Sequence, residues 1–549
     1  MKMGLGKTRL LLELLSTGKR ALVICTKSNI QVWANEIEKF FPDLNYMILH
    51  NDYIDGNTYD VTKKTIKKCQ IVVTTYETVR AHFEESQPKC FIIQQDNFHE
   101  PSPFHYSKNN IPDGFKINNI IKTRNTKKFS PIYTIKYERI IADECQYFAS
   151  VNSKIYQAMA CLKGNFHYAV SGTPIVNSEL DLFSAFKFIG LKIRPNDFKK
   201  EYYDNNNLKN YIISKDYSDT TIKIPKLNNI TIESPLSDIE KKMYNDMVLQ
   251  LKDAYTSFQK GNDTFAAPLG MFVRLRQICL CPYIITRESK KPRRVKKNET
   301  LPNILRSDNI LENLIKYINS ETLDNLMKAY PELENKLRTP FWRFKLVSFG
   351  LLPEFQLFTD PKLNLELANP DNIKKWSRIK KIIEQIKLIH KRKEKVLVFS
   401  SFVSFLNVLG DELKELEISF RQLDGSTKSS EREKIVKDFN EKEITVFLSS
   451  YKAGGVGLTM TSATNVILAE PWWNSATEQQ AIFRTHRIGQ TKPVNVYSMI
   501  TNPSFEVYLL KIQQKKSDKV EEYLGDSKTI IKRSVAKQII ENVIYGDLL

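Results

Sequence analysis

Short runs of aliphatic and β-branched residues, separated by helical stretches, are the feature that most constrains how this chain folds. Four such runs lie in the first third of the sequence, "ALVICT", "QIVVTTY", "YERIIADE" and "HYAVSGTP". Four more lie in the last third, "KVLVFSS", "ITVFLSS", "NVILAEP" and "VNVYSMI". Apolar runs of this length between helical segments are typical of buried parallel strands. Two separate sets therefore predict an α/β chain with two parallel-sheet lobes.

The rest of the sequence predicts the domain boundaries. We expect a first lobe over residues 1–190, with a surface insertion at 88–133 where Asn, Lys and Pro are frequent. Helical protrusions and a linker follow over 191–375, because "SDIEKKMYNDMVLQLKDAY" and "LGMFVRLRQI" have helical spacing. The second lobe is expected over 376–515, and a helical tail over 516–549.

Charge and cysteine usage narrow the class of protein. Lys and Arg number 82 against 62 Asp and Glu, a net charge of +20. This surplus suits a polyanionic partner such as nucleic acid, although a Lys-rich solvated surface is the alternative. Of the seven cysteines only Cys279 and Cys281 are close, without a nearby His. We therefore expect no structural zinc, no disulfide framework and a reducing intracellular compartment. No apolar run is long enough to cross a membrane.

The segment "MGLGKT" has the composition of a phosphate-binding loop that leads into a helix. Its glycines, Gly4 and Gly6, allow backbone N–H groups to face phosphates at the helix N-terminus. Lys7 would reach the β- and γ-phosphates of ATP, and Thr8 would bind Mg²⁺. The full phosphate-loop pattern is incomplete, because Met1 occupies the first position; a Gly-rich helix start is the alternative reading.

Two further segments of the first lobe would complete a hydrolytic site. In "RIIADECQ" an apolar strand ends in Asp143, which would hold Mg²⁺, and Glu144, which would deprotonate the attacking water. In "AVSGTP" the hydroxyl of Ser171 follows another strand and could sense the γ-phosphate. A surface Asp-Glu pair and a simple turn are the alternatives, but the three segments occur together in the right order.

The second lobe contributes two motifs. Gly454 and Gly455 in "YKAGGVGLT" would let the backbone approach a phosphodiester chain closely. Arg484 and Arg487 in "RTHRIGQ" lie three residues apart, hence on one helix face. Guanidinium groups there could neutralise charge on the transferring phosphate, whereas a solvated basic helix is the alternative.

Taken together, "MGLGKT", "DECQ", "SGTPIVN", "LDGST", "AGGVGLTMTSATNVILAEPWWN" and "RTHRIGQ" resemble, in order, the motifs of the Swi/Snf family of superfamily-two helicase-like ATPases. The segments "SPIYTIKYERIIADE", "VRLRQICLCPYII" and "EPWWN" look most like its repair and transcription-termination translocases. Many of these carry a RING ubiquitin-ligase insertion. This chain has no Cys or His from Pro282 to Lys375, so no RING is expected.

The resemblance implies two RecA-like lobes with helical protrusions and a nucleotide cleft between them. It assigns Lys7 and Thr8 to phosphate and Mg²⁺, Asp143 to Mg²⁺, and Glu144 to the catalytic base. The arginine fingers would be Arg484 and Arg487, with Gln146 as a further nucleotide-site residue. DNA-binding positions implied by the family are Lys27, Ser28, Thr75, Ser400, Ser401, Lys452, Gly454 and Gly455.

The sequence departs from the family pattern at three motifs. Met1 and Lys2 stand where Asp-Glu is usual, Gln146 replaces a His, and Phe483 replaces an Asp that could orient Arg484. Arg487 is therefore the safer finger. A phosphate loop normally follows a buried strand. We therefore expect the natural chain to extend upstream of Met1, with a strand that ends at this loop.

The function predicted from these motifs is an ATP- and Mg²⁺-dependent translocase on duplex DNA, largely independent of DNA sequence, that remodels or displaces bound proteins. A strand-separating helicase and a catalytically impaired DNA-binding scaffold are the alternatives. The expected location is the nucleus, or a viral DNA compartment.

Overall fold

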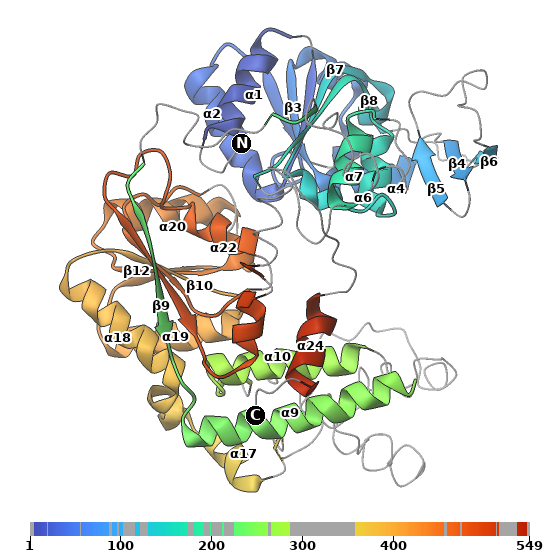
Figure 1. The fold of residues 1–549 in the computed structure, drawn as a ribbon. Coiled ribbons are helices and arrows are strands. Elements are labelled where there is room, and N and C mark those ends of the chain that lie inside the picture. Colours follow the sequence, from blue (N-terminus) through green and yellow to red (C-terminus); the bar gives the residue numbers. More distant parts are fainter. Residues whose placement is uncertain are drawn as a thin grey trace.

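The computed structural model describes residues 5–18, 20–54, 56, 58–86, 91–95, 98–102, 116–120, 130–172, 180–191, 198, 211–213, 224–261, 265–285, 357–358, 360–427, 429–454, 458–472, 475–511, 513–514 and 535–545. Two parallel sheets form the cores of two lobes, drawn above and below one another in Figure 1. The predicted α/β fold with two parallel-sheet lobes is confirmed.

The first sheet has five parallel strands in the order β2-β3-β1-β7-β8. Their bounds are β1 (Ala21–Cys25), β2 (Tyr46–Leu49), β3 (Ile71–Thr75), β7 (Lys136–Asp143) and β8 (Lys163–Val170). The central strands β1 and β3 are buried throughout, as continuous apolar runs require. Among the described residues β8 has only one neighbour, and Phe166 in it is 53% exposed.

Helices cover both faces of this sheet. One face packs against α1 (Lys7–Ser16) and α2 (Ile30–Phe40), and the other against α4 (Tyr76–Ser86) and α6 (Lys154–Ala160). The pattern follows from alternation along β1, where Val23 joins the first cluster, and Leu22 and Ile24 join the second. The remaining elements are α3 (Lys63–Lys68), α5 (Pro131–Thr134), α7 (Leu180–Phe188), and the 3-10 turns η1 (Lys27–Asn29), η2 (Thr58–Asp60) and η3 (Cys145–Phe148).

The predicted insertion contains a small antiparallel sheet in the order β5-β4-β6. Its strands are β4 (Phe91–Gln95), β5 (Phe98–Ser102) and β6 (Lys116–Ile120). In Figure 1 this sheet stands apart from the parallel sheet of the first lobe, as a surface insertion should.

The second sheet has six parallel strands in the order β11-β12-β10-β13-β14-β9. Five come from the predicted lobe, β10 (Val396–Ser400), β11 (Phe420–Leu423), β12 (Val446–Ser450), β13 (Asn465–Leu468) and β14 (Val494–Ile500). The sixth, β9 (Leu227–Glu233), comes from the segment expected to form helical protrusions and a linker. The predicted boundary at residue 376 is therefore wrong for this strand. Only partly buried, β9 lacks the continuous apolar run that indicates a central strand.

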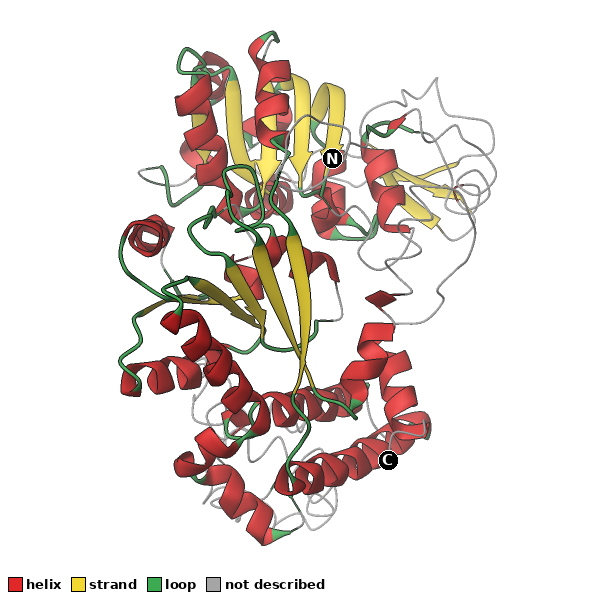
Figure 2. Ribbon diagram, turned by 60° about the vertical axis from the view of Figure 1, so that its left-hand side comes forward, coloured by secondary structure: helices red, strands yellow, loops and turns green. Residues whose placement is uncertain are grey.

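Helices surround the second sheet on both sides (Figure 2). One face packs against α18 (Ser377–Lys391) and α19 (Val403–Glu415), whose cluster continues into α9 (Asp238–Gln259), α10 (Ala266–Leu280) and α24 (Val535–Tyr545). The other face packs against α20 (Ser429–Glu441) and α22 (Ser475–Ile482). The remaining elements are α17 (Pro361–Ala368), η6 (Pro370–Lys375) and α21 (Tyr451–Gly454).

Two further observations concern membrane-spanning helices and the cysteines. Within the described ranges, no helix combines the length and apolar character that crossing a membrane requires. Cys161 takes part in a disulfide bond, which differs from the expectation drawn from cysteine spacing. Spacing along a chain does not tell which distant cysteines meet in the fold.

Candidate nucleotide and DNA site

The predicted site residues lie at the carboxyl ends of parallel strands in both lobes. In the first lobe, Lys27 follows β1, Thr75 ends β3 and Asp143 ends β7. In the second lobe, Ser400 ends β10 and Lys452 follows β12. Because strands in a parallel sheet run in one direction, these residues share one edge of each sheet, where ligands of open α/β sheets bind.

The phosphate loop leads into α1 at Lys7. Gly6 is the residue before the helix and has φ 73° and ψ 33°, in the left-handed region that favours glycine. No side chain caps the first turn of α1, so its backbone N–H groups face outward at the helix N-terminus. This geometry suits a phosphate. Gly4 lies outside the described residues.

Glu144, the predicted base, is held by a chain of side chains. Its backbone is left-handed, with φ 57° and ψ 54°, a costly conformation for a residue with a side chain. Gln146 donates from Nε2 to Glu144 Oε2 at 2.6 Å, and Ser171 donates to Gln146 Oε1 at 2.6 Å. Gln146, which stands where the family usually has a His, therefore links the predicted base Glu144 to Ser171, the residue that follows β8.

Asp143, the predicted Mg²⁺ ligand, is buried and accepts three hydrogen bonds. Trp33 Nε1 and Asn29 Nδ2 both donate to Asp143 Oδ2, at 3.1 and 3.2 Å, and Tyr76 donates to its backbone oxygen at 2.7 Å. Burial and the neighbouring charge of Glu144 raise the pKa of Asp143 to about 6. The bonds from Trp33 and Asn29, and the charge of Lys7, act in the opposite direction.

The segment "RTHRIGQ" of the second lobe is fixed by three side chains other than its two arginines. Thr485 and Gln490 donate to the backbone oxygen of Ala463, and His486 Nε2 lies 2.7 Å from the oxygen of Pro225. All three polar side chains are buried. They anchor a short loop that carries both predicted fingers, Arg484 and Arg487.

The charged groups of the two lobes act on one another. Burial lowers the pKa of Lys7; the charges of Arg484 and Arg487 lower it further, while Glu144 and Asp143 raise it. Burial also lowers the pKa of Arg484 to about 10, with repulsion from Arg487 in the same direction and attraction by Glu144 opposing it. Cation, carboxylates and guanidinium groups therefore converge where the lobes meet.

The predicted DNA-binding residues differ in their exposure to solvent. Lys27 is half exposed and pairs with Asp52 at 2.7 Å. Thr75 and Ser400 are buried, and their hydroxyls bond to Thr78 and to the N–H of Phe402. These two side chains therefore hold the loops that follow their strands. The side chain of Lys452 and the whole of Gly455 lie outside what the structure describes.

Ser401 belongs to a network that the sequence did not indicate. Glu470 Oε1 accepts bonds from the N–H and hydroxyl of Ser401, at 2.6 and 2.7 Å. Arg276 in α10 donates to the same hydroxyl at 3.1 Å, and its guanidinium lies 4.8 Å from the ring centroid of Trp472. The network connects the helical protrusion with the loops after β10 and β13.

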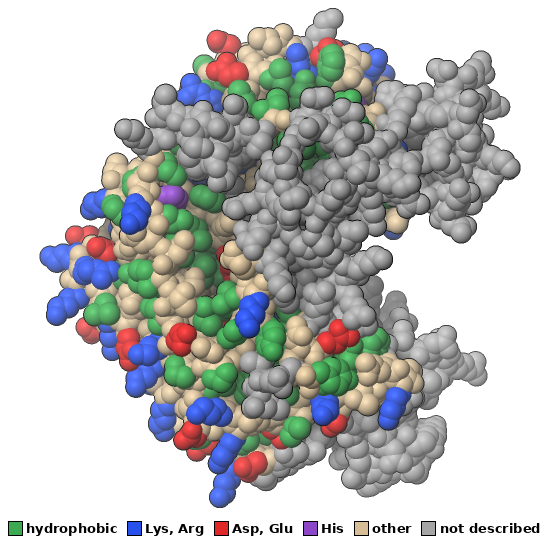
Figure 3. Space-filling model, viewed as in Figure 1, with side chains coloured by type: hydrophobic (Ala, Val, Ile, Leu, Met, Phe, Trp, Pro, Cys, Tyr) green, Lys and Arg blue, Asp and Glu red, His purple; other side chains and the backbone are tan. Residues whose placement is uncertain are grey.

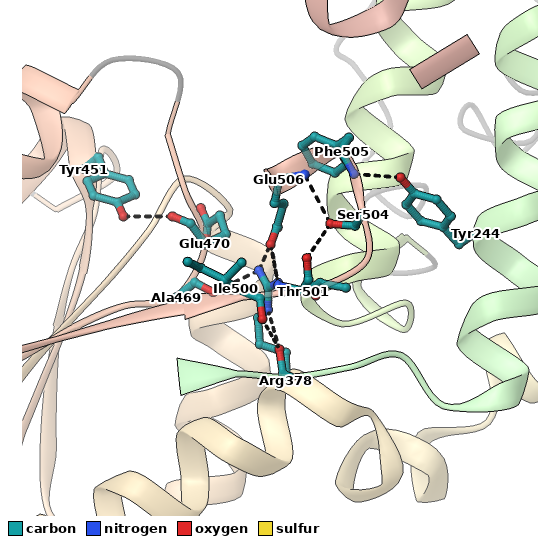
Figure 4. Close-up of polar contacts among 11 residues, drawn as sticks. Tyr244, Arg378, Tyr451, Ala469, Glu470, Ile500, Thr501, Ser504, Phe505 and Glu506 are labelled. Carbon is teal, nitrogen blue, oxygen red and sulfur yellow. Dashed lines mark hydrogen bonds and ion pairs between the residues drawn. The ribbon is translucent and has the colours of Figure 1, made fainter. Parts of the chain in front are cut away.

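A second buried network lies next to it (Figure 4). Arg378 at the start of α18 donates to both carboxylate oxygens of Glu506, to Thr501 and to the oxygen of Ala469. Phe505 N–H donates to the hydroxyl of Tyr244 in α9 at 2.9 Å. The contacts tie α18 and α9 to the chain that follows β14.

Several of these residues escaped the sequence analysis. Asn29, Trp33, Arg276 and Glu470 belong to no phosphate- or metal-binding motif, and only the fold brings them to the site. The sequence does contain one indication that Asn29 and Trp33 act together. They are four residues apart after a predicted strand, hence on one face of a helix.

Comparison with known proteins decides the family. Residues 2–284, more than half of the chain, match the family model described as SNF2-related domain. The chain belongs to the SNF2-related family. Residues 375–489 of this SNF2-related chain also match the helicase conserved C-terminal domain. The predicted Swi/Snf resemblance is confirmed, and with it the class of helicase-like, DNA-dependent ATPase.

Curated relatives of the SNF2-related chain include viral and cellular proteins. It is 28% identical to "Putative helicase 172L" of Invertebrate iridescent virus 6, over 100% of this chain and 88% of the relative. It is 25% identical to "DNA repair protein RAD5A" of Arabidopsis thaliana, over 92% of this chain and 51% of the relative. It is 25% identical to "ATP-dependent helicase FUN30" of Saccharomyces cerevisiae, over 99% and 46%. The chain thus spans about half the length of the two cellular relatives.

Among solved structures, a Sulfolobus solfataricus SWI2/SNF2 ATPase core in complex with dsDNA matches at 18% identity. The match covers 96% of this chain and 88% of that one, with a TM-score of 0.33. This overlap is low, so the fold assignment rests on the strand orders described above.

Proposed function

We propose that the protein is an ATP-driven translocase on duplex DNA that remodels or displaces proteins bound to it. The observation that carries this proposal is the convergence of Lys7, Asp143 and Glu144 from one lobe with Arg484 and Arg487 from the other. A nucleotide bound by both sets would draw the lobes together, and hydrolysis would release them. Alternation of this kind moves two DNA-binding lobes along a strand in steps.

The residues present fit ATP and Mg²⁺. Hydroxyl and carboxylate oxygens are the ligands Mg²⁺ prefers, and Thr8 and Asp143 would supply them. Bound Mg²⁺ would neutralise charge on the phosphates. Glu144 would take a proton from the water that attacks the γ-phosphorus, as the bond to the β-phosphate oxygen breaks and ADP leaves. Lys7 and Arg487 would neutralise the charge that develops on the phosphate oxygens.

Duplex DNA is the proposed track. Relatives are named as helicases and as a DNA repair protein, which supports a DNA substrate. On the face shown in Figure 3, exposed Lys and Arg of the second lobe are interspersed with Asp and Glu. The described side chains of the second lobe therefore form no one-signed patch on that face. Exposed Lys27 and the loops at the sheet edges are the proposed contacts, in a nuclear or viral DNA compartment.

Two assays test this proposal, one of third-strand displacement from a triplex and one of unwinding of a forked duplex. The protein should displace a third DNA strand from a triplex in an ATP-dependent manner, without separating a forked duplex. The Lys7→Ala variant should do neither, because its phosphate contact is lost. Unwinding of the fork would establish the helicase alternative. Wild-type protein without ATPase activity would establish the scaffold.

A further inference from the structure

The N-terminal part of α2 joins a predicted DNA contact to the predicted Mg²⁺ ligand. Lys27 and Ser28 occupy the single 3-10 turn η1, Asn29 ends that turn, and α2 begins at Ile30. Asn29 N–H donates to the oxygen of Thr26 at 2.8 Å, which closes the turn. The predicted DNA-binding residues and the start of α2 therefore form one continuous, hydrogen-bonded stretch of backbone.

Asn29 does not use its side chain as its position would suggest. Asn before a helix commonly accepts a bond from the first-turn N–H groups, a cap that stabilises by about 1 kcal/mol. Here no such bond forms, and Asn29 Nδ2 donates to Asp143 Oδ2 at 3.2 Å. The side chain of Asn29 therefore bonds to the carboxylate at the end of β7 and not to the first turn of α2.

Trp33 completes the connection. It lies one turn after Asn29 on the same helix face, is 1% exposed, and donates its indole N–H to the same Asp143 Oδ2 at 3.1 Å. Two donors on one oxygen fix the rotation of the carboxylate. The other oxygen, Oδ1, receives neither of these two bonds.

We propose that η1 and the first turn of α2 transmit DNA binding to the Mg²⁺–nucleotide site through Asn29 and Trp33. A DNA phosphate that contacts Lys27 would replace Asp52 as the partner of its ammonium group. This contact would hold η1 in one position. Asn29 and Trp33, as positioning residues, would then hold Asp143 in the orientation that binds Mg²⁺. This inference rests on the proposed function, since it takes Lys27 as a DNA contact and Asp143 as a Mg²⁺ ligand.

The experiment measures binding without hydrolysis. The dissociation constant of a non-hydrolysable ATP analogue is measured with Mg²⁺, with and without saturating duplex DNA. The ratio of the two constants is the coupling factor, and DNA affinity with and without the analogue must give the same factor. In wild-type protein DNA should tighten analogue binding about tenfold, a coupling of ordinary size.

Four variants complete the test. Trp33→Phe keeps an aromatic ring but removes the indole N–H. Asn29→Ala removes the other donor without disturbing the core, and Asn29→Asp replaces that donor with a charge like that of Asp143. Each should bring the coupling factor close to one, with DNA affinity in the absence of nucleotide unchanged. Asn35→Ala, an exposed position on the same helix, should couple like wild type.

The outcomes separate two failures. If duplex DNA neither stimulates wild-type hydrolysis nor changes analogue affinity, the proposed function fails. If DNA stimulates hydrolysis but Asn29→Ala and Asn29→Asp couple as Asn35→Ala does, the proposed function stands and the transmission route is wrong.

Discussion

Glu144 shows how a single side chain is prepared for chemistry. Its left-handed backbone turns it out of the line of β7, and its bond from Gln146 fixes one carboxylate oxygen. We expect Glu144→Gln to bind ATP with nearly wild-type affinity but to hydrolyse it orders of magnitude more slowly, because the proton acceptor is lost and the phosphate contacts remain. Equilibrium binding gives the ATP affinity, and single-turnover kinetics give the hydrolysis rate. Weak ATP binding by the variant would instead place Glu144 in the phosphate cradle.

The two arginines can be told apart by substitution. Phe483 stands where the family usually has an Asp able to orient the first arginine, so Arg487 is the predicted finger. Arg487→Ala should lower kcat at saturating DNA by about 10³-fold. Arg487→Lys should restore little, because a point charge does not reproduce a planar fork. Normal hydrolysis by Arg487→Ala would show that the second lobe does not complete the site.

At this scale the sequence motifs indicate the candidate catalytic and Mg²⁺-binding groups but not the side chains that contact them. Lys7, Asp143 and Glu144 sit in motifs whose local spacing predicts their proposed roles. Trp33 and Arg276 act through contacts between segments 110 and 125 residues apart. No local pattern encodes such contacts, so they became visible only in the fold.

At the scale of elements, α22 contains a carboxyl group that titrates near neutrality. Glu478 accepts bonds from Trp472 N–H at 2.6 Å and from Gln513 at 3.3 Å, and burial raises its pKa from 4.5 to about 7. The folded state therefore binds this proton more tightly than the unfolded state does. Its stabilising effect is complete below pH 4.5 and is lost as the pH rises through 7.

Replacing this group should change how stability depends on pH. Relative to Glu478→Gln, wild-type protein should lose unfolding free energy between pH 5 and 7, by at most about 1.4 kcal/mol per pH unit. Chemical denaturation of both proteins across this range measures the difference. Parallel pH profiles would mean that Glu478 keeps its ordinary pKa.

The strands show where sequence patterns succeed. β1, β3, β10 and β12 are five-residue apolar runs buried on both faces, and all four were predicted. β9 was missed because it lies at a sheet edge and reads "LNNITIE", half polar and with two Asn, a residue that strands disfavour. Edge strands face solvent on one side, so their hydrophobic signal is weak.

The whole molecule should bind duplex DNA mainly through phosphates. We expect the ATPase to be stimulated equally by duplexes of different sequence, with apparent affinity that falls steeply as salt rises, because each neutralised phosphate releases a counterion. Lys27→Ala should reduce the slope of log affinity against log salt by about one. Lys63→Ala, an exposed lysine at the start of α3 that belongs to no predicted DNA-binding motif, is the matched control and should leave the slope unchanged. An ATPase stimulated by single-stranded DNA alone would contradict the proposal that the protein moves on duplex DNA.

The pairing of β9 with β14 has a consequence for how the molecule forms. Asn228 and Asn495 are hydrogen-bonded across the two strands, 267 residues apart in the chain. During synthesis β9 must leave the ribosome long before its partner exists, and the second lobe can close only when β14 has followed. Such non-local pairing is slow and exposes unpaired strand edges in the meantime. The second lobe thus matures last and as a non-contiguous unit, and a fragment that starts at residue 376 would lack the strand that closes its sheet.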